Sequence, residues 1–235
     1  MDLEVCQLGL VSYAEALAVQ EQLLVMRQQN RIGDLLLLLE HNPVITLGRK
    51  AKTEHILMPQ EWLQKQQIEV YRTNRGGDVT YHGPGQIVGY MFIDLHHHGR
   101  SLRSFVHKLE QVFINLLERY YQINAFRDPD HTGVWVSQGK ITAIGLAVKR
   151  WVTMHGFAFN VNTNLEHFRW IVPCGIADKE VTSLAVLTGR EIDLQGVYQQ
   201  VLHSFCEVFH YNPVMLTQAQ LQSYLRSMSN EKAQT

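Results

Sequence analysis

The segment from Arg75 to Gln86 carries the densest combination of glycines and polar side chains in the sequence, RGGDVTYHGPGQ. Glycine lets the backbone take positive φ or approach a ligand closely, so this segment is expected to form one wall of a binding site and to offer N–H groups to it. A β-bulge or a long hairpin with an exposed arginine is the alternative, which the density of polar groups disfavours. The expected wall consists of Arg75, Gly76, Gly77, Asp78, Val79, Thr80, Tyr81 and His82.

Cys174 is the candidate nucleophile, because it stands between Pro173 and Gly175 in an expected loop. A thiolate attacks acyl carbonyls well once a neighbouring cation lowers the pKa of the thiol. An inert, packed thiol is the alternative, and it is the common fate of an isolated cysteine. The chain has three cysteines at wide spacing, which fits neither a disulfide framework nor a metal clamp, so each is expected to be a free thiol.

Lys140 begins an apolar strand of sequence GKITAIG. Most such lysines are solvated, but one that enters a site would lower the pKa of a nearby thiol and could then relay protons. The sequence HGFAFN, which begins at His155, has small residues suited to lining an apolar slot. A plain core strand would show the same pattern and stays open as the alternative.

Several histidines are weighed as further functional groups. His82 and His155 are expected to orient polar groups by hydrogen bonds, since the sequence supplies no Cys-His-Asp arrangement for either to act as a base. The three residues from His96 to His98 resemble a metal clamp, but adjacent residues of an extended segment point to alternate faces. They are expected to form an exposed loop, and no metal site is predicted.

Hydrophobic periodicity predicts the elements that must position these residues. Apolar residues at steps of three and four predict helices, with caps at Ser12, Asp193 and Thr217. Many strands follow one another without helices between them, which predicts one α+β domain over 1–235, with a mixed, mainly antiparallel sheet flanked by helices. The expected helices are 12–30, 59–67, 101–121, 193–210 and one from 217 before a polar tail from 227, and the expected strands are 35–40, 44–47, 70–72, 87–95, 133–136, 141–149 and 152–161.

The composition excludes several classes of function. Of the 235 residues, 46% are hydrophobic and 18% charged, which is typical of a packed globular protein. Lys and Arg total 21 against 22 Asp and Glu, so no field of one sign favours nucleic acid or an anionic membrane. No apolar run approaches the ~20 residues of a membrane helix, and the N-terminus lacks the basic start of a signal peptide, so a cytoplasmic protein is expected. The patterns GxxxxGK[ST] and GxGxxG are absent from the glycine-rich segment, so it gives no indication of nucleotide binding.

Six segments resemble, in order, those of the octanoyltransferases of protein lipoylation. They are RGGDVTYHGPGQIVGY from 75, TGVW from 132, GKITAIG from 139, HGFAFNV from 155, PCGI from 173 and TSL from 182. The match extends over about residues 40 to 185 and implies the fold of the catalytic domains of biotin and lipoate ligases. It also implies that Cys174 is the nucleophile, that Lys140 is its partner, and that no metal or cofactor takes part. The implied substrate wall is the Arg75 to His82 segment with Ala143, Ile144, Gly145, Gly156, Phe157 and Ala158.

The activity implied by this resemblance is that of an octanoyl-[acyl carrier protein]:protein N-octanoyltransferase. The octanoyl group would pass from acyl carrier protein through a thioester on Cys174 to a lysine of lipoyl domains, those of 2-oxoacid dehydrogenases and the glycine cleavage H protein. Because the net charge is near zero, an acidic carrier protein is expected to bind to a local cluster of basic residues. The candidate clusters are 49–52 and 149–150. A monomer is expected.

Two alternatives remain open at this point. An ATP-dependent lipoate or biotin ligase would share the fold but would not need a catalytic cysteine. A non-catalytic acyl-binding module could keep the glycine wall but would have no reason to retain both Lys140 and Cys174.

Overall fold

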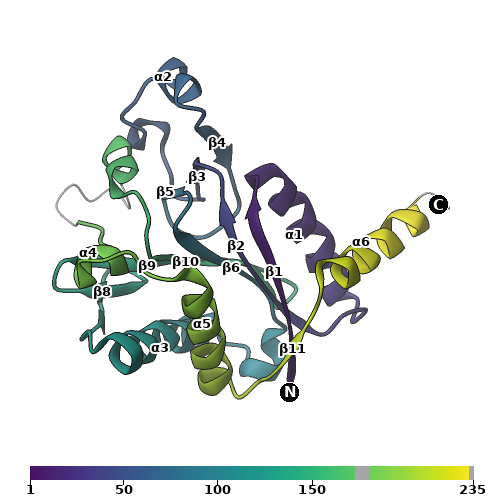
Figure 1. Cartoon of the computed structure of the whole chain (residues 1–235). Coiled ribbons are helices and arrows are strands. Elements are labelled where there is room, and N and C mark those ends of the chain that lie inside the picture. The colour runs from purple at the N-terminus through teal and green to yellow at the C-terminus, as the bar shows by residue number, and fades with distance from the viewer. Residues whose placement is uncertain (173–179, 233–235) are drawn as a thin grey trace.

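Two β-sheets form the framework of the protein in the computed structural model, which describes residues 1–172 and 180–232, with side chains through 227 (Figure 1). The larger sheet has the strand order β11-β1-β2-β6-β10-β9-β8-β7. Its first two pairings are parallel, and every pairing from β2 onward is antiparallel. The predicted mixed, mainly antiparallel sheet is therefore confirmed. The strands are β1 (Asp2–Val11), β2 (Asp34–His41), β6 (Gln86–Phe92), β7 (Phe126–Arg127), β8 (Val134–Val136), β9 (Gly139–Lys149), β10 (Val152–Asn160) and β11 (Asn212–Met215).

Helices cover both faces of the large sheet, as Figure 1 shows. On one face, α3 and α5 pack around Phe113, Phe157 and Phe205, because their apolar residues recur at helical spacing and form one stripe. On the other face, α1 and α6 pack around Leu23, Leu37 and other leucines. The helices are α1 (Tyr13–Gln28), α2 (Gln60–Lys65), α3 (Leu102–Tyr121), α4 (Leu184–Thr188), α5 (Leu194–Phe209) and α6 (Gln218–Lys232).

The smaller sheet has the order β4-β3-β5 and its own apolar core with α2, in which Ile45, Leu63 and Tyr81 are buried. Its strands are β3 (Val44–Leu47), β4 (Glu69–Arg72) and β5 (Val79–His82). The chain between β4 and β5 contains the start of the glycine-rich segment, Arg75 to Asp78. This small sheet therefore presents that segment to the rest of the molecule.

The starts of α1, α5 and α6 were predicted because their caps are encoded locally, whereas the short helix α4, capped by Ser183, was not predicted. The Ser12 hydroxyl accepts a hydrogen bond from the Glu15 N–H, and the Glu15 carboxylate accepts one from the Ser12 N–H, which completes a capping box. Asp193 and Thr217 likewise accept hydrogen bonds from the first turns of α5 and α6. Helix α6 continues to Lys232, so much of the polar segment from 227 is helical.

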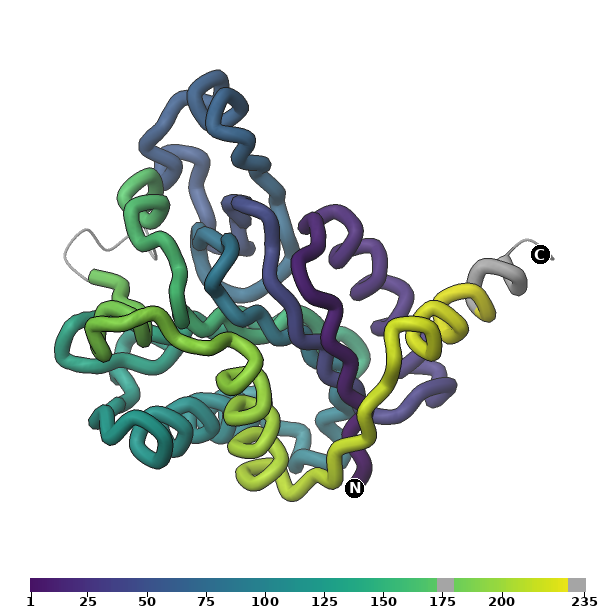
Figure 2. The backbone as a smooth tube through the Cα atoms, viewed as in Figure 1, coloured from purple at the N-terminus to yellow at the C-terminus, as the bar shows by residue number. Residues whose placement is uncertain are grey.

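The strands β1 and β11 were not predicted. They pair with each other side by side, in parallel, from Asp2 opposite Asn212 to Val5 opposite Met215 (Figure 2). Strand β11 is difficult to recognise from its sequence, since it is short and exposed and contains a proline. Over the described residues, no helix is long and apolar enough to cross a membrane.

Candidate functional site

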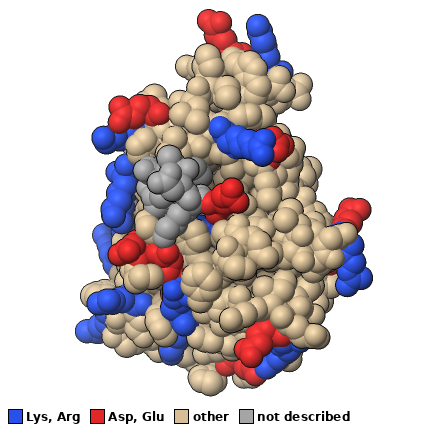
Figure 3. All heavy atoms as spheres, turned by 90° about the vertical axis from the view of Figure 1, so that its left-hand side faces the viewer, with Lys and Arg blue, Asp and Glu red and all other residues tan. Residues whose placement is uncertain are grey.

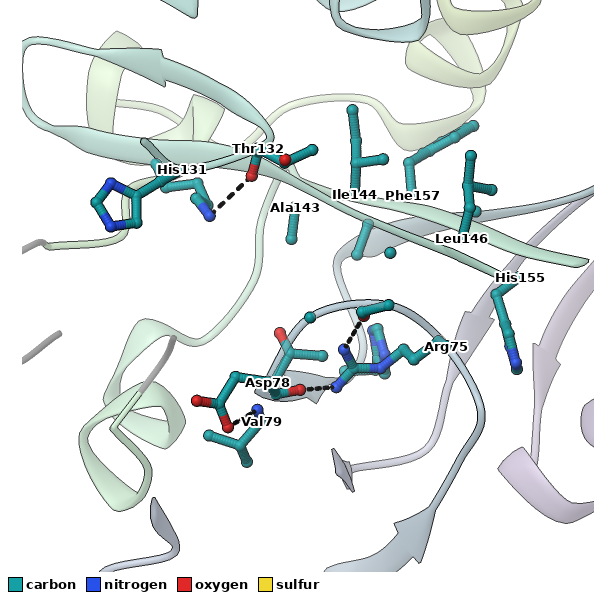
Figure 4. Close-up of a pocket in the computed structure, with 18 of the residues that line it drawn as sticks. Arg75, Asp78, Val79, His131, Thr132, Ala143, Ile144, Leu146, His155 and Phe157 are labelled. Carbon is teal, nitrogen blue, oxygen red and sulfur yellow. Dashed lines mark hydrogen bonds between the residues drawn. The ribbon is translucent and has the colours of Figure 1, made fainter. Parts of the chain in front are cut away.

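A cavity of about 540 Å³ lies between strands β9 and β10 of the large sheet and the segment that leads into β5. Lys140 lines it, together with every described residue predicted to bind substrate except Tyr81. Two parts of the chain that are distant in sequence thus meet at one cavity, the segment before β5 and the adjacent strands β9 and β10. Figure 4 shows β9 and β10 on one side and the Arg75 to Val79 segment on the other.

The sheet side of the cavity is made of very small residues. Ala143 lies directly opposite Ala158, and Gly145 directly opposite Gly156, so the two pairs share one face of β9 and β10. In Figure 4 the Ala143 side chain points toward the Arg75 segment, whereas those of Ile144 and Phe157 point the other way. The result is a shallow apolar floor that leaves room for a hydrocarbon chain.

The floor and the glycine-rich segment touch at one point. The Gly76 N–H donates a hydrogen bond of 2.9 Å to the Leu146 carbonyl. A Cβ on Gly145 would lie 2.9 Å from the Gly76 carbonyl oxygen, and one on Gly76 would lie 3.0 Å from the Leu146 oxygen. Glycine at both positions therefore allows the two backbones to approach, and this contact bounds the cavity.

The guanidinium of Arg75 is buried and holds its own segment in shape. Its Nη2 donates to the carbonyls of Thr46 and Asp78, both at 2.6 Å, and its Nε donates to the Thr46 hydroxyl at 3.0 Å. A third nitrogen, Nη1, donates to the Gly76 carbonyl. Several of the donors of the predicted substrate-binding arginine are thus engaged with the wall itself.

Asp78 has a comparable structural role in the same segment. One of its carboxylate oxygens accepts a hydrogen bond from the Val79 N–H and also lies 2.7 Å from His55 Nδ1. Gly77, just before it, has a φ of 85°, in the left-handed region that favours glycine. These contacts fix the turn from which Val79 and Thr80 line the cavity.

Polar groups line another part of the cavity wall, and burial keeps their histidines neutral. His82 Nδ1 lies 2.7 Å from Gln86 Oε1, and burial lowers the pKa of His82 to about 3. His155 Nε2 lies 2.6 Å from Asn74 Oδ1, and burial lowers its pKa to about 4. Both histidines have the hydrogen-bonding surroundings expected from the sequence.

Lys140 lies on the edge of the cavity at the start of β9. Its ammonium donates to the Thr132 carbonyl at 3.1 Å and lies 4.7 Å from the centroid of the Trp135 ring. Sequence reasoning missed Trp135, which β8 places directly opposite Lys140 of β9.

Cys174, the predicted nucleophile, lies outside the described residues. The described chain on either side of it is anchored near the site. The Val172 N–H donates to the His55 carbonyl, and the Lys140 N–H donates to the Glu180 carbonyl.

The other two cysteines lie in apolar surroundings. Cys6 is fully buried between α1 and the sheet, and burial raises the pKa of its thiol. Cys206 is half-buried on α5, and burial raises its pKa to about 11. Both thiols are therefore poor sources of thiolate at neutral pH.

Tyr81, which was expected in the substrate wall, and the three histidines from His96 to His98 lie away from the cavity. Tyr81 faces the core of the small sheet, where its hydroxyl lies 2.5 Å from His167 Nδ1. His96 contacts the Asp94 carboxylate, and His98 contacts the Tyr211 hydroxyl. Among the described side chains of residues 1–172 and 180–227, no three His, Cys, Asp or Glu groups are placed to hold a metal ion.

Comparisons with known proteins identify related sequences and a shared fold. The family model described as the lipoyl protein ligase A/B catalytic domain matches residues 12–206. An octanoyltransferase of Desulforamulus reducens is 52% identical over 221 residues, which cover 94% of this chain and 97% of the relative. An octanoyltransferase of Caldicellulosiruptor bescii is 54% identical over 210 residues, or 89% of this chain and 92% of the relative. A solved bi-partite lipoate protein ligase of Thermoplasma acidophilum shares the fold, with a TM-score of 0.71 at 15% identity over 100% of this chain and 94% of that one.

Proposed function

The chain belongs to the lipoyl protein ligase A/B catalytic-domain family, and on that premise we propose that it transfers an octanoyl group to lipoyl domains during protein lipoylation. The donor is octanoyl-acyl carrier protein, and the acceptor is a specific lysine of the lipoyl domains of 2-oxoacid dehydrogenases and of the glycine cleavage H protein. The observation that carries the proposal is the position of Lys140 at the edge of a cavity floored by Ala143, Gly145, Gly156 and Ala158.

The small-residue floor suits the acyl chain. Each buried CH₂ group contributes about 0.8 kcal/mol to binding, so an eight-carbon chain gains substantially from an apolar slot. The names of the relatives that are about half identical to this chain point to the same acyl group. The cytoplasm is the proposed location.

In the proposed first half-reaction, the Cys174 thiolate attacks the carbonyl carbon of the octanoyl thioester. The bond from that carbon to the carrier's sulfur breaks, and the departing thiolate takes a proton from the Lys140 ammonium. One thioester replaces another at nearly balanced free energy, so this step needs neither ATP nor a cofactor. The Thr132 carbonyl and the Trp135 ring, which contact Lys140 Nζ, support the charged form from which the proton leaves.

In the second half-reaction, the neutral amine of the acceptor lysine attacks the octanoyl carbonyl carbon. The bond to the Cys174 sulfur breaks, and the now neutral Lys140 accepts the proton lost by the amine. The cysteine thiolate and the lysine ammonium are both restored. Lys140 thus serves as acid in one half-reaction and as base in the next.

The acidic carrier is proposed to approach over Arg49 and Lys50, which are exposed and line the cavity. The other basic pair, Lys149 and Arg150, lies at the opposite end of β9 from Lys140. On the face shown in Figure 3, basic side chains are interspersed with acidic ones. Recognition there would depend on a local cluster rather than on a broad charged face.

The test is an intact-mass measurement on the protein incubated with octanoyl-acyl carrier protein in the absence of ATP. An octanoyl adduct is expected, and it should disappear as added apo lipoyl domain gains the octanoyl group. An absolute need for ATP would instead identify a ligase. No adduct and no transfer would fit a non-catalytic acyl-binding module.

Three single variants identify the thiol in the same assay. Cys174→Ala should abolish the adduct. Cys6→Ala and Cys206→Ala are the matched controls and should retain it, because both thiols are held in apolar surroundings. Loss of the adduct in either control would assign the intermediate to another cysteine.

A further inference from the structure

Two buried amide side chains face each other at the ends of β6 and β10. Gln86 and Asn160 are directly opposite in the register of these strands, and their side chains are almost fully buried. The Gln86 amide nitrogen donates 2.9 Å to Asn160 Oδ1 and also donates to the Tyr81 carbonyl. Its amide oxygen faces His82 Nδ1 at 2.7 Å.

These partners fix the orientation of both amides. Because the Gln86 nitrogen has two carbonyl acceptors, its oxygen must be the group that accepts from His82 Nδ1–H. Asn160 Oδ1 then accepts from Gln86, which leaves the Asn160 amide nitrogen to donate elsewhere. It donates 3.0 Å to the carbonyl oxygen of Thr182.

Thr182 belongs to a short segment that runs along Lys140. The Thr182 N–H donates 3.0 Å to the Lys140 carbonyl, and the Lys140 N–H donates 2.9 Å to the Glu180 carbonyl, which forms a parallel bridge centred on Val181. The approach is close, since a Cβ on Gly139 would lie 2.4 Å from the Glu180 oxygen. Thr182 is thus held at both ends: its carbonyl accepts from Asn160, and its N–H bonds to the Lys140 carbonyl.

The same chain of hydrogen bonds extends in the other direction to the glycine-rich wall. His82 Nε2 faces the Thr46 hydroxyl at 3.5 Å, and that hydroxyl accepts from Arg75 Nε. Donors and acceptors therefore alternate from Arg75 to Thr182 through His82, Gln86 and Asn160. A buried chain of hydrogen bonds of this kind holds the groups that it joins in one arrangement.

We propose that Asn160, oriented by Gln86, is a positioning residue that sets the place of Lys140 by holding the Glu180–Thr182 segment against it. This inference rests on the proposed octanoyl transfer for its kinetic consequence. The claim that Asn160 holds the Glu180–Thr182 segment in place rests on the hydrogen bonds alone. Asn160 lines the cavity wall, but its donor points to Thr182 rather than to a substrate.

The test replaces the donor while keeping the shape of the side chain. Asn160→Asp keeps an oxygen for Gln86 to donate to but turns a carboxylate oxygen toward the Thr182 carbonyl, which repels it. Gln86→Glu, which removes the donor to Asn160, is the second variant if the first fails to fold. The matched control is Asn162→Asp, because Asn162 donates 2.8 Å to the Ile192 carbonyl through the same kind of bond.

The first measurement is hydrogen exchange of backbone amides. Asn160→Asp should speed exchange at the Thr182 and Lys140 amides, and Asn162→Asp should not. Hydrogen exchange does not depend on activity. It therefore tests whether Asn160 holds the segment in place even if the wild-type protein does not transfer octanoyl and the proposed function is wrong. Equal protection of these amides in all three proteins would overturn the positioning role.

The second measurement separates positioning from general damage. In the octanoyl-transfer assay, Asn160→Asp should lower kcat by about 10- to 100-fold with the KM for the donor nearly unchanged, because small displacements of a reacting group cost rates of that order. In a Lys140→Ala background the same change should have little further effect, since its action passes through Lys140. An equal fold-loss in both backgrounds, or with Asn162→Asp, would contradict the proposal.

Discussion

Trp135 and Lys140 are direct cross-strand neighbours on β8 and β9, and the lysine ammonium lies 4.7 Å from the centroid of the indole ring. The ring is almost fully buried, and its own N–H donates to the His131 carbonyl. The indole is therefore fixed in place. A rigid aromatic face beside a cation stabilises the charged form and restricts where the ammonium can lie.

Replacement of Trp135 by leucine should slow octanoyl transfer by about two- to fivefold. This fold-change corresponds to the loss of a cation–π contact that contributes about 0.5–1 kcal/mol. Trp135→Phe keeps a ring and should retain most of the rate. The measurement is the single-turnover rate of transfer from the acyl-enzyme. Trp151→Leu, at an exposed position in the turn between β9 and β10, should leave that rate unchanged; equal losses in both would rule out a specific effect at Lys140.

Arg75→Lys should destabilise the protein and weaken substrate binding together. The guanidinium donates to four oxygens of the wall and of β3, and an ammonium cannot reproduce that planar set of donors. We expect the free energy of unfolding to fall by about 2 kcal/mol and the KM for the octanoyl donor to rise. Urea unfolding and steady-state kinetics measure the two effects. Arg72→Lys, on the exposed side of β4, should change the free energy of unfolding by no more than about 0.5 kcal/mol.

Gly156→Ala should be strongly destabilising, because an added Cβ would lie 1.9 Å from the Gly89 carbonyl oxygen on the paired strand β6. Backbone atoms in the middle of a sheet cannot move aside easily, so a loss of about 1–3 kcal/mol or more is expected. Thermal unfolding would show this as a lowered Tm. Gly33→Ala, where nothing lies within 4 Å of the added carbon, is the control. If the two variants melt at the same temperature, the strands are not as closely packed as described.

Three buried histidines should make the protein less stable in mild acid. Burial lowers the pKa of His82 to about 3 and those of His41 and His155 to about 4, below the ordinary value of about 6.5. At pH values between these lowered pKa values and about 6.5, the unfolded chain binds more protons than the folded protein. The free energy of unfolding therefore falls as the pH drops. Each histidine contributes up to about 1.4 kcal/mol per pH unit in that window.

Urea unfolding at a series of pH values below about 6.5 measures this dependence. His82→Gln cannot take up a proton, so its free energy of unfolding should vary less steeply with pH than that of the wild type. The difference in slope should disappear above the ordinary pKa of histidine. An unchanged slope would mean that His82 is protonated in the folded protein.

The parts of the fold that were predicted from sequence are those whose signal is local. The apolar stripe of α3 and the cap at Asp193 are contained within one helix each, and both are found where expected. Strand β5 is not among the predicted strands, because it is short and lies among glycines. Its recognition as a strand would have indicated that Tyr81 points away from Thr80 and His82, since side chains alternate along a strand.

The interactions of the site were harder to predict because they depend on main-chain atoms and on register. The acceptors that hold Arg75 include the carbonyls of Thr46 and Asp78, and a carbonyl leaves no mark on the residue type. Gln86 and Asn160 are far apart in sequence, and only the pairing of β6 with β10 brings them together. The motif residues indicated which segments form the site, whereas the structure shows which of their atoms are in contact.

The parallel pairing of β1 with β11 has a consequence for the order in which the protein is assembled during translation. Strand β1 leaves the ribosome early and can pair with β2 as soon as that strand follows. Its other edge stays open until the residues of β11 have been synthesised. Until β11 is synthesised, the nascent chain thus exposes an unpaired strand edge of the kind that promotes association between chains, and β11 is the last strand to join the large sheet.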